Sequence, residues 1–264
     1  MKLAISNIAW KAEQDSEMYA FLQEQGIKGL EIAPTRIFTE NPYEQNTEAE
    51  KWAANLKDSY DLVIPSMQSI WFGKNEKIFG EQSERDVLID YTKKAIDFAA
   101  VIGCKNLVFG CPRNRSFEGE YPEEIAVAFF KELGDYAYSK GTVLAMEANP
   151  TIYNTNFVNE TKQAFELVKK VNSPGFLVNV DLGTIIYNSE SLKDLEENIQ
   201  LINHIHISEP GLALIEKRQL HNELAEILSQ SHYDKFISIE MKTQDDLQSV
   251  KDTVLYVKEV FVEK

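Results

Sequence analysis

The sequence predicts a single (β/α)8 barrel that uses the whole chain. Its 264 residues are close to the length of one such barrel, about 250 residues. Short β-branched segments alternate with longer amphipathic segments through eight successive units, and strict alternation of strand and helix implies a parallel sheet. No linker rich in Pro, Gly or Ser separates the units, so residues 1–264 are expected to form one domain.

Eight segments have the length and the β-branched composition of strands. An open dinucleotide-binding sheet would need a G-x-G-x-x-G turn after its first strand, but the chain there reads Asn7-Ile8-Ala9-Trp10. The barrel is therefore preferred to the open sheet. The predicted strands are Lys2–Ser6, Lys28–Ile32, Leu62–Met67, Asn106–Gly110, Thr142–Glu147, Phe176–Asp181, His204–Ser208 and Phe236–Met241.

Segments with helical periodicity fill the intervals between the predicted strands. The run from Ser83 to Asp86 resembles a capping box, and Asn159 or Thr161 offers a cap oxygen to the segment that follows. The predicted helices are Ser16–Gln25, Glu48–Tyr60, Ser83–Ile102, Tyr121–Lys140, Thr161–Val171, Ser191–Leu201, Gln219–Ser229 and Gln244–Phe261.

The last four predicted strands carry polar residues on one face. Side chains alternate between the two faces of a strand, and the helical shell is apolar, so the polar face is expected to point to the barrel axis. Active sites of such barrels lie at the C-terminal ends of the strands. The alternative is that these are ordinary polar groups at strand ends, but their spacing, one βα unit apart, favours a shared site. The residues are Glu147, Asp181, His206 and Glu240.

Three carboxylates and one imidazole at a shared site predict a divalent metal ion. Buried charge is unfavourable unless it is compensated, and a bound cation supplies that compensation. Oxygen donors with one imidazole suit a hard to borderline ion, so we expect one divalent metal, Mn²⁺ in preference to Mg²⁺, Co²⁺ or Zn²⁺. His204 shares the face of His206 but lies deeper, and it is expected to be a core histidine or a partner of a ligand.

At these residues the chain resembles the xylose isomerase-like TIM-barrel superfamily, in particular its sugar phosphate isomerase and epimerase branch. The resemblance implies that the four residues bind one divalent metal, with Glu147 and Glu240 also acting as the catalytic acid/base pair. The implied reaction is isomerisation or epimerisation of a sugar or sugar phosphate through an enediolate. The matching segments are Gly26–Ile32, Met146–Pro150, Val180–Thr184, His204–Glu209 and Ser238–Met241.

Several related reactions stay open. Ketose 3-epimerases tend to carry a histidine where Thr184 stands and an arginine soon after Glu209, where the chain reads Pro210-Gly211-Leu212, so that specificity is disfavoured. A keto-inositol-type dehydratase on the same metal site is an alternative, because it too begins by removing a proton beside a carbonyl. An AP-endonuclease-like nuclease would need a histidine-rich zinc cluster, and the chain has only 4 histidines. A non-catalytic sugar-binding barrel is the remaining alternative.

Seven residues near the predicted strand exits are candidates for substrate contact. Arginine and lysine there suit a carboxylate or phosphate, although surface ion pairs would explain them equally well. An aromatic ring at the rim could cover the apolar face of a sugar or seal the barrel mouth. The candidates are Glu31, Gln68, Trp71, Arg113, Arg115, Glu209 and Lys242.

The composition limits the classes of partner. A net charge of −15 argues against a nucleic-acid surface, because phosphates must be met by clustered lysine and arginine. Cys104 and Cys111 are too few for a disulfide framework. No apolar stretch approaches the roughly 18 residues of a membrane span, and the N-terminus lacks the apolar core of a signal peptide. We therefore expect a soluble, cytoplasmic enzyme that acts on a small molecule; association into a homo-oligomer stays open.

Overall fold

The computed structural model describes residues 1–263 and has the barrel architecture that the sequence predicts. Eight parallel strands form one sheet in the order β2-β1-β8-β7-β6-β5-β4-β3. Isolated parallel bridges join Gly29 to Val63 and Ile32 to Met67, and these close the ring between its two outer strands. The strands are β1 (Lys2–Ser6), β2 (Gly29–Glu31), β3 (Ser66–Met67), β4 (Asn106–Phe109), β5 (Leu144–Glu147), β6 (Phe176–Asp181), β7 (Ile202–Ile207) and β8 (Phe236–Ile239).

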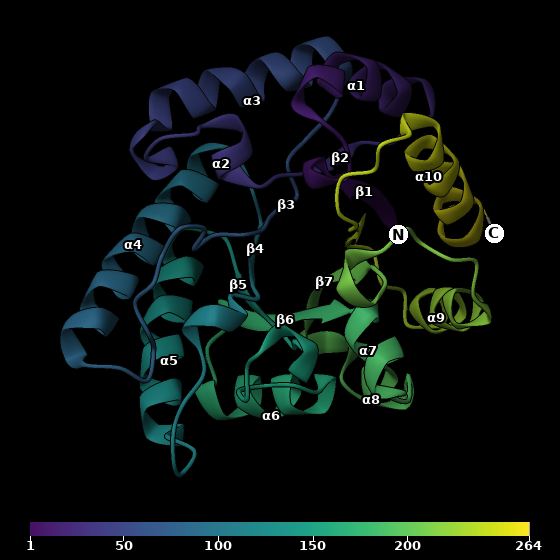
Figure 1. Ribbon diagram of the computed structural model, residues 1–264. Coiled ribbons are helices and arrows are strands. Elements are labelled where there is room, and N and C mark those ends of the chain that lie inside the picture. Colours follow the sequence, from purple (N-terminus) through teal and green to yellow (C-terminus); the bar gives the residue numbers. More distant parts are fainter. Residues whose placement is uncertain (264) are drawn as a thin grey trace.

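The helices surround the strands on the outside of the barrel (Figure 1). They are α1 (Asp15–Glu24), α2 (Pro34–Ile37), α3 (Asn46–Tyr60), α4 (Gln82–Val101), α5 (Glu123–Ser139), α6 (Thr161–Val171), α7 (Leu182–Asn188), α8 (Lys193–Glu197), α9 (Gln219–Gln230) and α10 (Leu247–Phe261). Short 3₁₀ turns lie in the connections: η1 (Asn7–Ala9), η2 (Ala12–Gln14), η3 (Pro42–Glu44), η4 (Pro112–Asn114), η5 (Thr151–Tyr153), η6 (Ile199–Leu201) and η7 (Pro210–Leu212).

Every predicted strand occurs at its expected place, and β1, β6 and α6 agree with the prediction to the residue. The third strand differs most, because only two residues of the predicted Leu62–Met67 segment form β3. Pro65 lies directly before β3 and has no N–H to donate to a neighbouring strand. The segment before it is joined to the sheet by the single bridge at Val63.

The N-cap residues of α4 and α6 differ from those that the sequence predicts, and the structure adds two short helices. The N-cap of α4 is Glu81 rather than Ser83, and its N–H donates to Glu84 Oε2 at 3.0 Å. The N-cap of α6 is Glu160, whose N–H donates to Gln163 Oε1 at 3.2 Å. In both cases the box is closed by a side chain at the third helical position. Helices α2 and α7 were not predicted, because so few residues show no periodicity.

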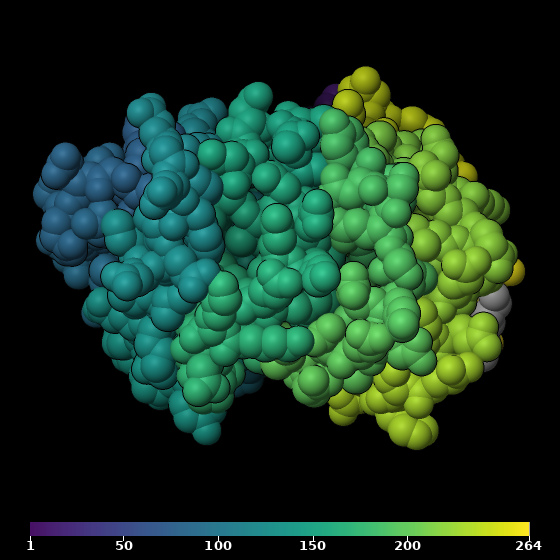
Figure 2. All heavy atoms as spheres, turned by 90° about the horizontal axis from the view of Figure 1, so that it is seen from below, coloured from purple at the N-terminus to yellow at the C-terminus, as the bar shows by residue number. Residues whose placement is uncertain are grey.

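The contact between α5 and β6 shows how closely the shell packs on the barrel. Phe130 of α5 stacks on Phe176 of β6 with their ring centroids 4.8 Å apart. A Cβ added to Gly175 would lie 2.1 Å from the carbonyl oxygen of Gly134 in α5, so both backbones meet directly at this point. The space-filling view shows the teal and green segments, which include α5 and α6, as a continuous outer layer on this side (Figure 2).

None of the helices within residues 1–263 combines the length and the apolar character that crossing a bilayer requires.

Candidate active site

The structure brings together the four polar residues that the strand pattern singles out. Their ligand atoms, one from each residue, all lie within 4.8 Å of one another. Each comes from the C-terminal end of a different strand, and the pairing of β6 with β7 sets Asp181 opposite His206. All four are buried, with at most 8% of each residue exposed. The four are Glu147 at the end of β5, Asp181 at the end of β6, His206 near the end of β7 and Glu240 directly after β8.

His206 stands at the centre of this group. Its Nδ1 atom lies 2.9 Å from Glu147 Oε1 and 3.2 Å from Glu240 Oε2. These are ion-pair distances, but Nδ1 forms a hydrogen bond with neither carboxylate because the angles are unsuitable. The buried nitrogen therefore faces the carboxylates without a hydrogen-bond partner, as the lone pair of a metal-binding imidazole would.

Asp181 is fixed at the start of a helix. Its Oδ2 atom accepts from the N–H of Thr184 at 2.8 Å and so caps α7, and the Thr184 hydroxyl lies at the same distance. Oδ1 accepts a hydrogen bond from the hydroxyl of Ser208, which follows β7. Thr184, the residue at which the sequence departs from ketose 3-epimerases, therefore orients the aspartate.

Two asparagine side chains fix Glu147. Asn179 of β6 donates to Glu147 Oε1 at 2.8 Å, and Asn149 donates to Oε2 at 3.1 Å. The register of β5 and β6 sets Asn179 directly opposite Glu147, so the sheet itself positions this contact. With both oxygens bound, the carboxylate is held in one orientation toward His206.

The electrostatics of the site favour a bound cation. Burial raises the pKa of Asp181, and the charge of Glu147 adds to that rise. Burial likewise raises the pKa of Glu240. Burial alone would lower the pKa of His206, but the charges of Glu31 and Glu240 outweigh it and raise the pKa well above its ordinary value. Without a metal, this group must therefore take up protons to balance its negative charge.

A cavity of about 160 Å³ opens beside three of the four residues. Its lining combines polar residues with small and apolar residues from β4 and from the loops that follow β4 and β7. No lysine or arginine lines it within the described part of the chain. The lining residues are Gln68, Ser69, Val108, Gly110, Cys111, Pro112, Glu147, Asn149, Tyr153, Asp181, Leu212 and Glu240.

The candidates for substrate contact differ in whether they line the cavity. Gln68 lines the cavity, where its amide donates to Ser6 Oγ at 2.6 Å. Arg113 and Lys242 are exposed and stand outside the lining. Glu209 is buried, and both of its carboxylate oxygens accept hydrogen bonds from Arg218 at 2.6 Å. It therefore forms an ion pair beside the site. Only Gln68 among these is in position to touch a molecule in the cavity.

Arg115 and Trp71 are turned into the protein. Arg115 is fully buried and donates to the carbonyl oxygen of Glu147 at 2.8 Å, and burial lowers its pKa to about 10. The Trp71 ring packs edge-on against Phe109, and its Nε1 donates to Thr92 of α4 at 2.8 Å. Glu31 is also fully buried and contacts His206 from the side away from the cavity. Neither Arg115, Trp71 nor Glu31 lines the cavity.

Loop residues that the sequence pattern did not select complete the cavity. Tyr153 lies in η5, and its hydroxyl accepts a hydrogen bond from the N–H of Gly211 at 3.1 Å. Burial, and then the charge of Asp181, raises the pKa of Tyr153 to about 12, so the phenol keeps its proton at neutral pH. Cys111 has a left-handed backbone (φ 45°) that places it in the wall rather than in the core.

The donor set fits a divalent cation on the chemistry of its atoms. Three buried carboxylates offer hard oxygen donors, and one imidazole nitrogen without a hydrogen-bond partner faces them. Glu147, Asp181 and His206 are already held by partners outside the cluster, as the ligands of a built metal site are.

Comparison with known proteins agrees with the fold. A profile described as xylose isomerase-like TIM barrel matches residues 19–260. Among curated proteins, none matches the sequence. The apo form of E. coli 3-keto-D-glucoside 4-epimerase, YcjR, has a TM-score of 0.80 at 18% identity, with 98% of this chain and 99% of that chain covered.

Two further solved structures show the same likeness. D-psicose 3-epimerase from Clostridium cellulolyticum H10, solved with D-tagatose, has a TM-score of 0.79 at 12% identity, with 99% of each chain covered. The IolI protein with a binding zinc atom has a TM-score of 0.73 at 16% identity, with 99% of this chain and 100% of that chain covered. At such low identities, the likeness to solved structures shows the fold alone.

Proposed function

Because the chain belongs to the xylose isomerase-like TIM barrel family, we propose that it is a metal-dependent sugar isomerase or epimerase. The observation that carries the proposal is the convergence of three buried carboxylates and one imidazole at the edge of a cavity. Solved structures with this fold include two sugar epimerases and a protein with a zinc atom, which supports the same class of reaction.

We propose that Glu147, Asp181, His206 and Glu240 hold one divalent metal, with Mn²⁺ preferred because oxygen donors dominate. When bound, the metal would act as a Lewis acid that stabilises negative charge on the oxygens of the substrate. The protein contributes fixed orientation: Asn149 and Asn179 hold Glu147, and Thr184 and Ser208 hold Asp181.

Glu147 and Glu240 are proposed as the acid/base pair. They come from β5 and β8, and they approach the same nitrogen of His206, so they flank one small volume. One carboxylate would remove the proton from the carbon beside the carbonyl, and the other would return a proton to that carbon or to its neighbour. Return to the same carbon gives epimerisation, and return to its neighbour gives isomerisation.

The lining of the cavity favours an uncharged sugar over a sugar phosphate. A phosphate inside it would meet no lysine or arginine from the described chain, and it would lie near three carboxylates. Gln68, Asn149 and Tyr153 offer amide and hydroxyl groups that can bind sugar hydroxyls. A phosphorylated substrate would have to extend to the exposed rim, where Arg113 and Lys242 lie.

Metal analysis and solvent exchange test this function. The purified protein should contain or take up one equivalent of divalent metal, and incubation with active keto-sugars in D₂O should place deuterium on a substrate carbon. Glu147→Gln and Glu240→Gln should slow the exchange about 10³-fold, whereas Glu226→Gln, an exposed position on α9, should not change it. If the metal-loaded protein catalysed no exchange with any sugar tested, the proposal would be contradicted. A product that has one water less than the substrate would identify a dehydratase.

A further inference from the structure

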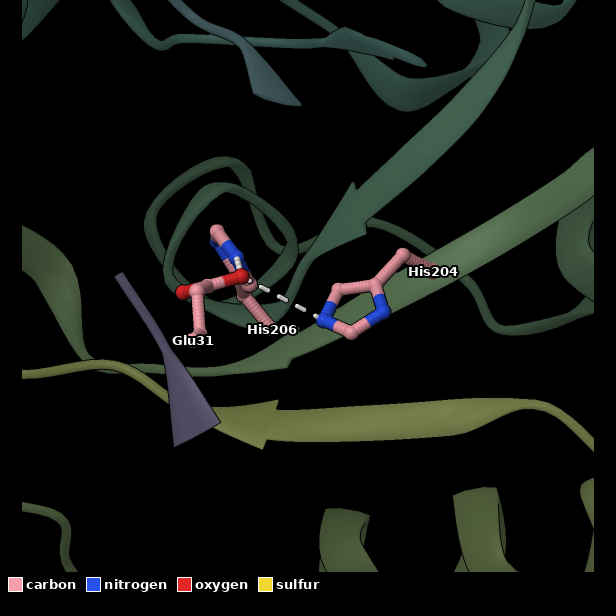
Figure 3. Close-up of side chains that lie close together, drawn as sticks. All are labelled: Glu31, His204 and His206. Atoms are coloured by element: carbon pink, nitrogen blue, oxygen red, sulfur yellow. Dashed lines mark hydrogen bonds and ion pairs between the residues drawn. The ribbon is translucent and has the colours of Figure 1, made fainter. Parts of the chain in front are cut away.

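A second carboxylate–histidine group lies beneath the proposed metal site. Glu31 ends β2 and is fully buried, and its Oε2 atom accepts a hydrogen bond from His206 Nε2 at 3.0 Å. The same oxygen lies 3.4 Å from His204 Nε2, while Oε1 accepts from the Gln68 amide at 3.3 Å. Figure 3 shows Glu31 reaching from β2 toward both histidines of β7.

The two ring nitrogens of His206 therefore face different partners. Nε2 points to Glu31, whereas Nδ1 points to Glu147 and Glu240 without a hydrogen bond. An imidazole that binds a metal is neutral and carries one proton, and an ionised carboxylate can only accept a hydrogen bond from that proton. With its proton held on Nε2 by Glu31, the ring offers the lone pair of Nδ1 to the centre of the four-residue group.

We infer that Glu31 is a positioning residue that sets the tautomer and the ring orientation of His206 and thereby the affinity of the site for a divalent metal. The inference rests on the proposed function, because it presupposes the metal site. Glu31 does not line the cavity, so this role differs from contact with substrate hydroxyls.

The charge of Glu31 itself supports this role. An ionised carboxylate in a barrel interior is unfavourable unless strong partners compensate for it, so a residue needed only for packing would be apolar. His206 is the nearest of its histidine partners, whereas His204 Nε2 has a closer partner in Ser238 Oγ at 2.7 Å. Strands β1 and β8 separate β2 from β7 in the sheet, so the contact crosses the barrel interior.

Glu31→Gln tests the inference with a side chain of the same size. The amide can turn its NH₂ group toward Nε2, which would move the imidazole proton to Nδ1 and block the lone pair. We expect the dissociation constant for Mn²⁺, measured by titration calorimetry, to rise about 10- to 100-fold. Glu31→Asp keeps the charge and should recover part of the affinity.

Ser238→Ala is the matched control. Ser238 lies opposite His206 in the pairing of β7 with β8, but its hydroxyl bonds His204. The change therefore removes a buried hydrogen-bond partner of His204 and leaves the contact of His206 with Glu31 in place, so the affinity for Mn²⁺ should stay as in the wild type. If Ser238→Ala weakened binding as much as Glu31→Gln, general loosening of the barrel interior would explain both, and the inference would be overturned.

A spectroscopic measurement on the unaltered protein keeps the inference testable even if Glu31→Gln fails to fold. In the Zn²⁺-loaded protein with ¹⁵N-labelled histidine, the proton of His206 should be found on Nε2; a proton on Nδ1 would overturn the inference. Wild-type protein that bound Mn²⁺ no more tightly than Glu31→Gln would also overturn it, while leaving the metal site intact. Failure of the wild type to bind any divalent metal would instead contradict the proposed function.

Discussion

The two halves of the barrel, β1 to β4 and β5 to β8, contribute unequally to the proposed metal site. In the second half, each of β5 to β8 ends in or beside a residue of the proposed metal site. In the first half, β1 to β4 end at Ser6, Glu31, Met67 and Phe109, and Glu31 is the only acidic residue among them. Glu31 contacts the site from beneath and does not line the cavity. Under the proposed function, the second half would supply the acid/base groups, and Glu31 of the first half would position His206.

The two halves also differ in how their strands are joined. Strands β6 and β7 have six residues each and pair at four positions, with one register shift between Val178 and Asn179, whereas β2 has three residues and β3 has two. The junction of β2 with β3 consists of isolated bridges. Groups that must be held within fractions of an ångström are better placed on strands that pair over several residues than on isolated bridges. The polar cluster lies on the more regular half.

The largest expected effect comes from removing one proposed acid/base group in the second half. Glu240→Gln should slow proton exchange between substrate and solvent about 10³-fold, because the amide cannot take up the proton. The rate is measured by deuterium incorporation at saturating metal.

The matched change in the first half is Gln68→Met, at a cavity position that offers only a hydrogen bond. It should reduce kcat/KM about 5- to 10-fold, the value of one hydrogen bond of about 1 kcal/mol. Equal losses in the two variants would refute the division of roles between the halves.

Removal of the metal should lower the free energy of unfolding, because the proposed ligands join the four strands of the second half. A metal that binds only the folded protein adds about 2.7 kcal/mol at 100 times its dissociation constant, so chelation should lower the free energy of unfolding by this amount. Urea denaturation with and without Mn²⁺ measures the difference. A variant that lacks His206, such as His206→Ala, should unfold at the same urea concentration in both conditions; a preserved difference would place the metal elsewhere.

Arg115 lies at the seam between the halves, in the loop after β4, and binds the backbone carbonyl at the end of β5. Arg115→Met should lower the free energy of unfolding by about 2 kcal/mol, because the carbonyl oxygen of Glu147 stays buried without its donor. Chemical denaturation checks this value. The neighbouring Arg113→Met, at an exposed position, should change stability by less than about 0.5 kcal/mol.

The smallest effect at neutral pH concerns a histidine in the helical shell of the second half. His221 of α9 is buried beside the Tyr256 hydroxyl at 2.9 Å, and burial lowers its pKa from 6.5 to about 4. Between these values the unfolded chain binds a proton that the folded protein does not, so this residue makes stability rise as the pH increases from about 4 to 6.5. At neutral pH the contribution vanishes.

His221→Gln should therefore flatten the dependence of the midpoint of unfolding on pH in that window, relative to the wild type. An unchanged slope would mean that the titration of His221 is the same in the folded and unfolded states.

The sequence predicts the barrel and the four central side chains well, because both depend on local periodicity. Alternation along β6 to β8 assigns Asp181, His206 and Glu240 to the inner face, and the structure confirms that these side chains converge with Glu147. The same alternation identifies Glu31 as inward-facing, but it cannot tell which strand lies across the barrel interior. The partner of Glu31 depends on tertiary contacts.

The positions of loop residues were predicted less well, because they too depend on tertiary contacts rather than on a periodic pattern. Ser69 adopts a left-handed conformation (φ 55°), and the turn it begins, closed by the Phe72 N–H, directs Trp71 toward α4 instead of over the cavity. Arg115 also follows a strand but bends inward to bind backbone carbonyls. Tyr153 and Leu212 line the cavity from turns whose course no periodic pattern describes.

Asp181 both belongs to the proposed metal site and begins α7, so one carboxylate serves two structures. The Thr184 amide, which donates to it, therefore reports on the site from the backbone. Metal bound by Asp181 would draw electron density from the shared oxygens and shift the resonance of this amide. A metal titration followed at this one amide resonance would rank divalent metals by their affinity for the site, and it needs no knowledge of the substrate.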